Sequence, residues 1–149
     1  MNQDTLGLKG KVLLVHTTKD GEVYKYETPN TIVNVGKAQV AGLINGVVTN
    51  YFEYLAIGTG TTAANVSDTG LEAEVESRGA ATTSRVTTSV TNDTAQLVYT
   101  WNFTSSYAIT ESGIFDSSTG GTLLARQVFD AINVGSGDSL QVTWKLQVS

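Results

Sequence analysis

Residues 109–129 read ITESGIFDSSTGGTLLARQVF, and this stretch decides the fold of the chain. Apolar residues lie on both sides of its central glycine pair, which is typical of two strands joined by a glycine-rich turn. The segments before and after it, residues 97–103 (LVYTWNF) and 140–148 (LQVTWKLQV), alternate apolar and polar side chains. Successive side chains of a strand point to opposite faces, so this alternation predicts strands with one buried face. Trp101 and Trp144 keep the spacing of their aliphatic neighbours, and we expect both in the core.

The composition also favours strands. The chain has 149 residues, of which 40% are hydrophobic and 15% charged, whereas about 25% are charged in a typical soluble domain. Much of the remaining polarity comes from threonine, which suits strands because its branched Cβ packs on a pleated surface. With 15 Gly and one Pro, the turns rely mainly on Gly and Asn. We predict one mainly β domain over residues 1–149, either a β-sandwich or a barrel-like fold.

The net charge and the lack of cysteine exclude several classes of function. The chain carries a net charge of −5 and has no run of clustered Lys and Arg, which a surface that follows phosphates or an anionic membrane requires. We therefore expect neither nucleic acid nor a membrane as a partner. Without cysteine, disulfides, Cys-based metal sites and thiol nucleophiles are not available. No apolar run resembles a signal peptide or a membrane span.

The first part of the chain predicts an arm followed by a hairpin. Residues 1–10 are polar and contain glycine, which is typical of an extended N-terminal arm. Residues 11–27 contain two β-rich runs separated by Asp20 and Gly21. This dipeptide favours a tight hairpin turn, because such a turn requires positive φ angles. The arm and the hairpin precede the main β domain, which we place at residues 32–149.

One substantial helix is expected at about residues 34–48. Its apolar residues recur at a spacing that places them on one helical face; they are Val35, Val40, Leu43, Ile44, Val47 and Val48. Asn34 is a candidate N-cap. Three glycines weaken the helical propensity, so the helix must be held by packing. We expect it to cover one face of a sheet.

A long polar loop, residues 58–70 (GTGTTAANVSDTG), follows a strongly apolar segment. Long loops of compact domains are often functional or bound by a partner. Its small residues could cradle a phosphate, but neither the lysine of a P-loop nor a following helical pattern is present. We therefore interpret it as a structural loop.

A row of carboxylates follows the loop. Glu72, Glu74 and Glu76 alternate, so a strand would point them to one face, with Arg78 next in line. Acid–base catalysis or a cation site is conceivable for such a row, but a solvated face or an ion-paired subunit contact fits three like charges better. Arg85 or Arg126 could supply the opposite charge. The candidate subunit or shell contacts are Thr59, Thr61, Thr62, Glu72, Glu74, Glu76, Arg78 and Arg126.

The remaining reactive residue types form no catalytic motif. His16 has no neighbouring carboxylate or nucleophile in the sequence, and Ser112 lacks the signature of a nucleophile elbow. Three tyrosines, Tyr24, Tyr26 and Tyr107, are weak candidates for contacts with a sugar. The sequence therefore predicts no catalytic residue, no cofactor and no metal site, and the protein is not expected to be an enzyme.

Two pairs of motifs resemble structural proteins of tailed-bacteriophage particles. The first pair is residues 54–60 (YLAIGTG) and 68–74 (DTGLEAE), which are similar to an A-I-G-x-G strand end, a Ser/Thr-rich loop and an x-T-x-L-x-x-E strand. The second pair is residues 109–116 (ITESGIFD) and 123–126 (LLAR), which are similar to an E-x-G-I/L-F-D segment, a glycine turn and an L-L/I-A segment. The resemblance extends over residues 32–148, whereas the hairpin at residues 11–27 has no counterpart in it.

The resemblance implies a virion component. One such class is the capsid decoration, or cement, proteins, which bind the outer shell as homotrimers and stabilise it. The alternative class is the tail-fibre, baseplate or connector components, and a sugar-binding β module for host attachment is a third. The chain lacks the long repetitive shaft of a fibre, which favours decoration. The expected partners are further copies of itself and the major capsid protein or other virion proteins. The expected location is the capsid exterior, after synthesis in the host cytoplasm.

Overall fold

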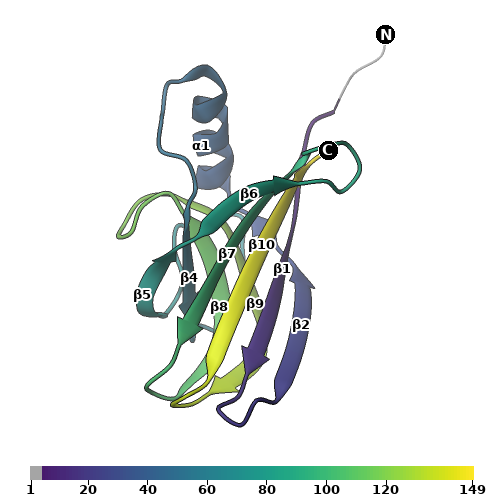
Figure 1. Cartoon of the computed structure of the whole chain (residues 1–149). Helices are drawn as coiled ribbons and strands as arrows, with labels where there is room; N and C mark the ends of the chain where they lie inside the picture. Colours follow the sequence, from purple (N-terminus) through teal and green to yellow (C-terminus); the bar gives the residue numbers. More distant parts are fainter. Residues whose placement is uncertain (1–4) are drawn as a thin grey trace.

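The protein is a sandwich of two five-stranded antiparallel sheets (Figure 1). The computed structural model describes residues 5–149, so residues 1–4 of the predicted arm lie outside the described residues. Sheet A has the order β2 (Val23–Pro29), β1 (Leu8–Thr17), β10 (Ser139–Val148), β7 (Thr94–Asn102) and β6 (Thr82–Val86). Sheet B has the order β3 (Thr31–Ile32), β9 (Leu123–Val134), β8 (Tyr107–Phe115), β4 (Tyr54–Gly58) and β5 (Glu74–Ala80). The prediction of a mainly β fold with one helix is confirmed, and across the described residues the sheets do not close into a barrel.

The core lies between the two sheets and is centred on Trp144. Trp144 and Trp101 are both buried, as the alternation predicts. In β10, Trp144 pairs with Val12 of β1 on one side and with Leu97 of β7 on the other. Its ring N–H donates a hydrogen bond of 3.1 Å to the Ser112 hydroxyl on β8. One side chain of sheet A is therefore bonded directly to sheet B.

The predicted hairpin is present but belongs to the sandwich. Gly21 has a φ of 87° at the turn, and β1 pairs with β2 beyond it. β1 begins at Leu8, inside the segment predicted to be an arm. It lies between β2 and β10 because its alternating apolar residues, such as Val12 and Leu14, face the core. Residues 8–10 of the predicted arm thus belong to β1, which is an interior strand of sheet A.

The helix α1 (Asn34–Asn45) is shorter than predicted. It ends where Gly46 adopts a left-handed conformation with φ 78°, which is the usual way to end a helix with glycine. Its N-cap is Val33, and Asn34 instead starts the first turn and donates its backbone N–H to the carbonyl of Val66. Within residues 5–149, no helix has the length and the apolar character needed to cross a bilayer.

The helix stands at one end of the sandwich and does not cover a sheet face, contrary to the prediction (Figure 1). Its first turn is anchored by Gly36, where an added Cβ would lie only 2.6–2.7 Å from backbone atoms of Leu124. Only a glycine allows this close approach of helix and strand. Val40 in the next turn packs against the core from a half-buried position, whereas Val35, Ile44 and Val47 remain exposed; Ile44 is 76% exposed.

The chain crosses from sheet B to sheet A between β5 and β6. β5 ends at Ala80 and β6 begins at Thr82, so a single residue separates strands of different sheets. Glu76 has a φ of 60°, and the pairing of β4 with β5 shifts register around this residue. The residues between Val75 and Gly79 of β5 therefore form a bulge against β4.

Asp138 joins two turns at the end of sheet A opposite the helix. Its carboxylate lies 2.9 Å from Nε2 of His16 and accepts the backbone N–H groups of Gly135 and Lys19, each at 2.9 Å. The hydrogen bond to His16, followed by that from Gly135, holds the pKa of the Asp138 carboxyl below its usual range. His16 therefore has a structural partner.

Acid is expected to destabilise this fold below about pH 4. Hydrogen bonds also lower the pKa of Asp93, first from the N–H of Val90, and the pKa of Glu72, first from Thr62. A depressed folded-state pKa gives stability that is complete above the unfolded pKa and is lost as the pH falls through the folded value. Urea unfolding at about pH 7 and about pH 3 measures this loss. Between these two pH values, the Asp138→Asn variant should lose less unfolding free energy than wild type. Equal unfolding free energies of wild type at both pH values would contradict the prediction.

Candidate functional site

A buried ion pair lies at the centre of the candidate site. Glu111 on β8 is 0% exposed, and its Oε1 accepts a hydrogen bond of 2.9 Å from Nε of Arg126 on β9. The same carboxylate accepts the backbone N–H groups of Gly60, Glu72 and Ala73 at 2.8–2.9 Å. A buried charge is tolerated when it is paired and hydrogen-bonded in this way. Glu111 therefore binds both ends of the loop that joins β4 to β5.

Arg126 binds the middle of the same loop. This residue is 2% exposed. Its Nη1 donates to Asp68 at 2.8 Å and its Nη2 donates to the carbonyl of Thr62 at 3.0 Å. Burial by itself lowers the pKa of Arg126, but the hydrogen bonds to Asp68 and Glu111 outweigh it and raise the pKa above its ordinary value. Residues 59–73, which have no regular secondary structure, are thus held by contacts at three places.

The predicted contact residues at the loop tip are partly available. Thr61 and Thr62 are exposed, and Thr59 is half-buried. Glu72 turns back toward the tip and accepts the backbone N–H groups of Thr61 at 2.9 Å and Thr62 at 3.3 Å. Arg126 was a predicted contact with another subunit, but it is buried and its partners belong to its own chain. The loop tip, in contrast, is accessible.

The carboxylates do not form the predicted row. Glu74 pairs within its own strand with Arg78 at 2.9 Å, while Glu72 precedes the strand and Glu76 lies at the bulge. Arg78 lies over the ring of Phe115, 3.5 Å from its centroid, in a cation–π contact. The bulge interrupts the alternation on which the prediction depended, and Glu72 and Glu74 have separate partners.

Glu111 was not among the contact residues predicted from the sequence. One signal was present: Glu111 is the only charged residue between Asp93 and Asp116. A lone acidic residue in a strand of the core requires a buried partner. The nearest basic residue in the following strand, Arg126, is that partner. Its other ligand, Asp68, comes from the loop, and no local pattern indicates that contact.

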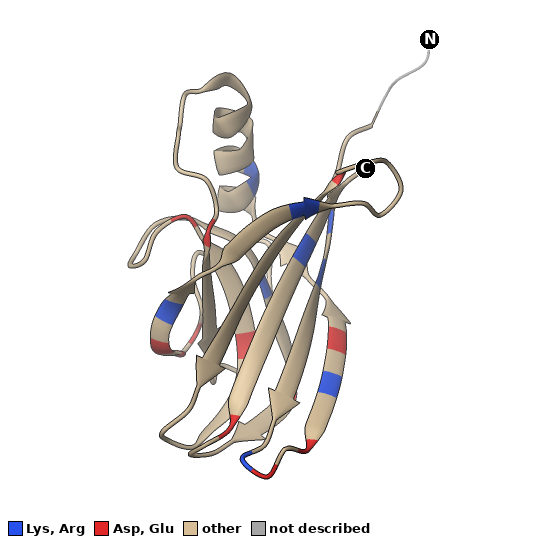
Figure 2. Ribbon diagram, viewed as in Figure 1, with Lys and Arg blue, Asp and Glu red and all other residues tan. Residues whose placement is uncertain are grey.

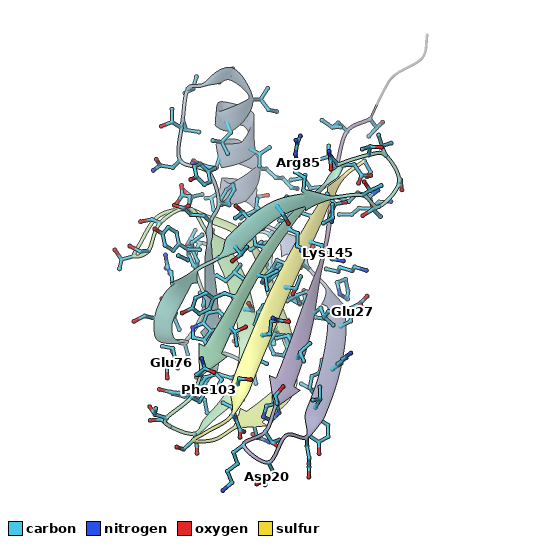
Figure 3. The ribbon with its side chains drawn as sticks, viewed as in Figure 1. Asp20, Glu27, Glu76, Arg85, Phe103 and Lys145 are labelled. Atoms are coloured by element: carbon cyan, nitrogen blue, oxygen red, sulfur yellow. The ribbon has the colours of Figure 1, made fainter. Side chains whose placement is uncertain are left out.

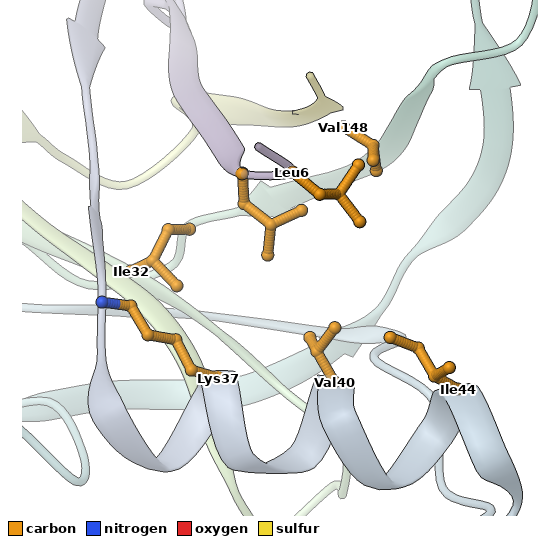
Figure 4. Close-up of a pocket in the computed structure, with 8 residues that line it drawn as sticks. Leu6, Ile32, Lys37, Val40, Ile44 and Val148 are labelled. Atoms are coloured by element: carbon orange, nitrogen blue, oxygen red, sulfur yellow. The ribbon is translucent and has the colours of Figure 1, made fainter. Parts of the chain in front are cut away.

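An open apolar groove lies beside the helix. It has a volume of about 700 Å³ and is lined by residues of α1, of β3, of the start of β1 and of the end of β10 (Figure 4). Leu6 is 74% exposed and Ile44 is 76% exposed on its two sides. Lys37 is the charged residue of its lining. Exposed apolar surface of this kind is a candidate binding surface.

A small basic patch lies on the outer face of sheet A. Lys11 of β1 is directly opposite Lys145 of β10, and Lys9 lines the same hollow of about 170 Å³. Lys145 is far from Lys9 and Lys11 in the sequence, so composition alone did not reveal the patch. Glu27 lies 3.5 Å from Lys11 and offsets part of its charge. Three lysines are fewer than the six to ten phosphate contacts of a typical DNA-binding surface.

Across residues 5–149, no three or more His, Asp and Glu side chains are arranged to hold a metal ion. The site thus consists of a fixed loop, held by Glu111 and Arg126, and an apolar groove next to it. Asn34 at the start of α1 joins the two, because its N–H donates to the carbonyl of Val66 in the loop. No protein-family model matches the chain, and no curated protein matches its sequence.

Proposed function

We propose that this chain is a structural protein of a tailed-bacteriophage particle, specifically a non-enzymatic capsid decoration protein that binds the outer shell as a homotrimer and stabilises it. One observation carries the proposal: the motifs that resemble this class meet at one place. Ile57 and Gly58 of the first motif pair with Ser112 and Glu111 of the second. The Glu111 carboxylate then binds the loop between the motifs and Arg126 at their end.

The arrangement suits binding better than catalysis. The Glu111 carboxylate accepts hydrogen bonds from three backbone N–H groups and from Arg126. With these bonds, the carboxylate has no oxygen free to contact a substrate. Its role in the proposed function is to hold the loop. A loop that is already ordered loses little conformational entropy when it binds. The exposed tip with Thr61 and Thr62 can therefore dock as a rigid element.

The apolar groove supplies the second part of the proposed shell contact. Ile44 and Leu6 are largely exposed beside it, and burying such side chains against the shell contributes about 25 cal/mol per Å² of apolar area. Binding to the assembled shell and not to its free subunits would stabilise the particle by mass action. The loop and the groove adjoin at the start of α1, so one surface can present both.

The test is binding of the purified protein to shells that lack it. The substitution Ile44→Asp is expected to weaken binding about tenfold or more, because it buries a charge without a partner. Ala108→Asp is the matched control, since Ala108 is also exposed but lies on β8 away from the helix. Equal binding of wild type and Ile44→Asp would contradict the proposed contact.

The location in the particle tests the class. Electron microscopy of virions should show density for this chain over the whole shell. Density only at the tail would contradict decoration and would support the alternative, a tail-fibre, baseplate or connector component. Copy number gives an independent measurement, because a decoration protein is far more abundant in purified particles than a tail component.

A further inference from the structure

The strand β2 has a free edge. Within the described residues, it pairs only with β1. Hydrogen-bonded and non-bonded pairs alternate along an antiparallel ladder. Gly7 bonds to Ser149, so the odd-numbered residues of β1 bond to β10. Thr18 bonds to Glu22, so the even-numbered residues of β1 bond to β2. Even-numbered residues of β1 bond to even-numbered residues of β2. The N–H and C=O groups of the odd-numbered residues of β2 therefore point away from the sheet; these are Val23, Lys25 and Glu27.

The even-numbered side chains of β2 face inward but are poorly covered. Tyr24 and Tyr26 share the face of β1 that carries the buried His16 and Leu14. They nevertheless remain 46% and 40% exposed, because the edge strand of sheet B on this side, β3, has only two residues. A cavity of about 300 Å³ lies next to Tyr26. Two tyrosines of this edge are thus available to a partner.

The charges of β2 complement those of an identical strand. Lys25 and Glu27 lie on the outer face and are exposed, and Figure 2 shows basic and acidic segments alternating along this strand. In an antiparallel pair of β2 strands with Tyr26 opposite Tyr26, each Lys25 faces a Glu27. If Lys25 were opposite Lys25, like charges would face each other, which destabilises a pair. In Figure 3, Glu27 marks β2, one of the two edge strands of sheet A.

We propose that β2 binds β2 of a second copy of this chain, antiparallel, around a two-fold axis at Tyr26. The odd-numbered residues then pair through their free backbone groups, so Lys25 and Glu27 exchange N–H···O=C bonds in both directions. Pro29 lies opposite Val23, where its carbonyl accepts the Val23 N–H; because proline has no N–H, the second bond of this pair cannot form, and the paired ladder ends here. The tyrosine side chains of the two copies cover one another, and sheet A continues through both molecules.

This contact does not depend on the proposed function. It uses an edge that the groove and the loop leave free. In a trimer, each copy would keep its β2 edge, and the contact would then link one trimer to the next.

The first test exchanges the charges. Lys25→Glu and Glu27→Lys each place two like charges opposite each other in the homodimer and should weaken the β2 contact about tenfold or more. An equimolar mixture of the two variants should restore it, because all facing pairs are then opposite in charge. Sedimentation equilibrium of wild type, each variant and the mixture measures the association. Absence of self-association in wild type, or no recovery in the mixture, would overturn the proposal.

The second test fixes the register and concerns β2 alone. The chain has no cysteine, so a single introduced thiol reports one contact. Tyr26→Cys should form a disulfide-linked dimer on mild oxidation, because residues opposite each other at a non-bonded position have Cα atoms about 4.5 Å apart. Lys25→Cys is the matched control and should cross-link more slowly. Faster cross-linking of Lys25→Cys would exclude the register, while failure of both would exclude the contact and leave shell binding unaffected.

Discussion

Arg126→Met is expected to lower the free energy of unfolding by about 3–5 kcal/mol. The substitution keeps much of the side-chain volume but leaves the Glu111 carboxylate buried without its cationic partner. It also removes the hydrogen bonds to Asp68 and to the carbonyl of Thr62, which hold residues 59–73. Urea denaturation followed by circular dichroism measures the loss. Limited proteolysis should cut the loop faster in the variant than in wild type.

The control for Arg126 is Lys11→Met. Lys11 also pairs with a glutamate, Glu27, but at 3.5 Å and with both side chains more than half exposed. An exposed pair contributes about 0–1 kcal/mol, so this variant should unfold close to wild type. A loss for Arg126→Met no larger than that of Lys11→Met would show that the buried pair is not what holds the loop.

Trp144→Ala is expected to destabilise the protein by about 3–5 kcal/mol. The side chain is fully buried between the sheets, and its removal leaves a cavity that neighbouring strands cannot fill without moving. It also breaks the hydrogen bond from the indole N–H to Ser112, which links sheet A to sheet B. Thermal and urea unfolding measure the effect, and the near-ultraviolet circular dichroism of the core should weaken.

Gln141→Ala provides the comparison on the same strand. Gln141 is exposed on β10, and substitutions at such positions usually change stability by less than about 0.5 kcal/mol. If Trp144→Ala and Gln141→Ala were equally stable, the core would not be centred on Trp144. Trp144→Phe should lie between them, because it keeps an aromatic ring but loses the N–H donor.

The sequence predicted a mainly β fold, either a sandwich or a barrel-like domain, because alternation is a strong signal in long strands. Both tryptophans obey it, and so does β10 around Val142 and Leu146. The helix was harder to place. Its apolar stripe predicted burial on a sheet, but the helix meets the sandwich chiefly at Gly36 and Val40. An apolar stripe on a helix indicates a surface that needs a partner, but it does not identify that partner. Only the structure showed that much of the apolar surface of α1 is exposed to solvent.

The candidate site was only partly predictable for a similar reason. Thr61, Thr62 and Glu72 were predicted as contact residues from local sequence patterns, and they lie together at the loop tip. The pair that fixes the loop, Glu111 and Arg126, comes from two different strands. Their contact depends on the register of β8 with β9, which a local pattern does not specify. Alternation also failed at Glu76, where a bulge changes the direction of the strand.

The place of β10 in sheet A has a consequence for how the chain folds. β10 follows all other strands along the chain, yet it lies between β1 and β7 (Figure 1). During synthesis on the ribosome, β1 and β7 therefore each have one unpaired edge until β10 has emerged. Pairing of β1 with β10 closes almost the entire chain into a loop, and such non-local contacts give folding times of milliseconds to seconds. In that interval, transient strand edges are open to misassociation, and chaperones that shield them would raise the yield of native protein.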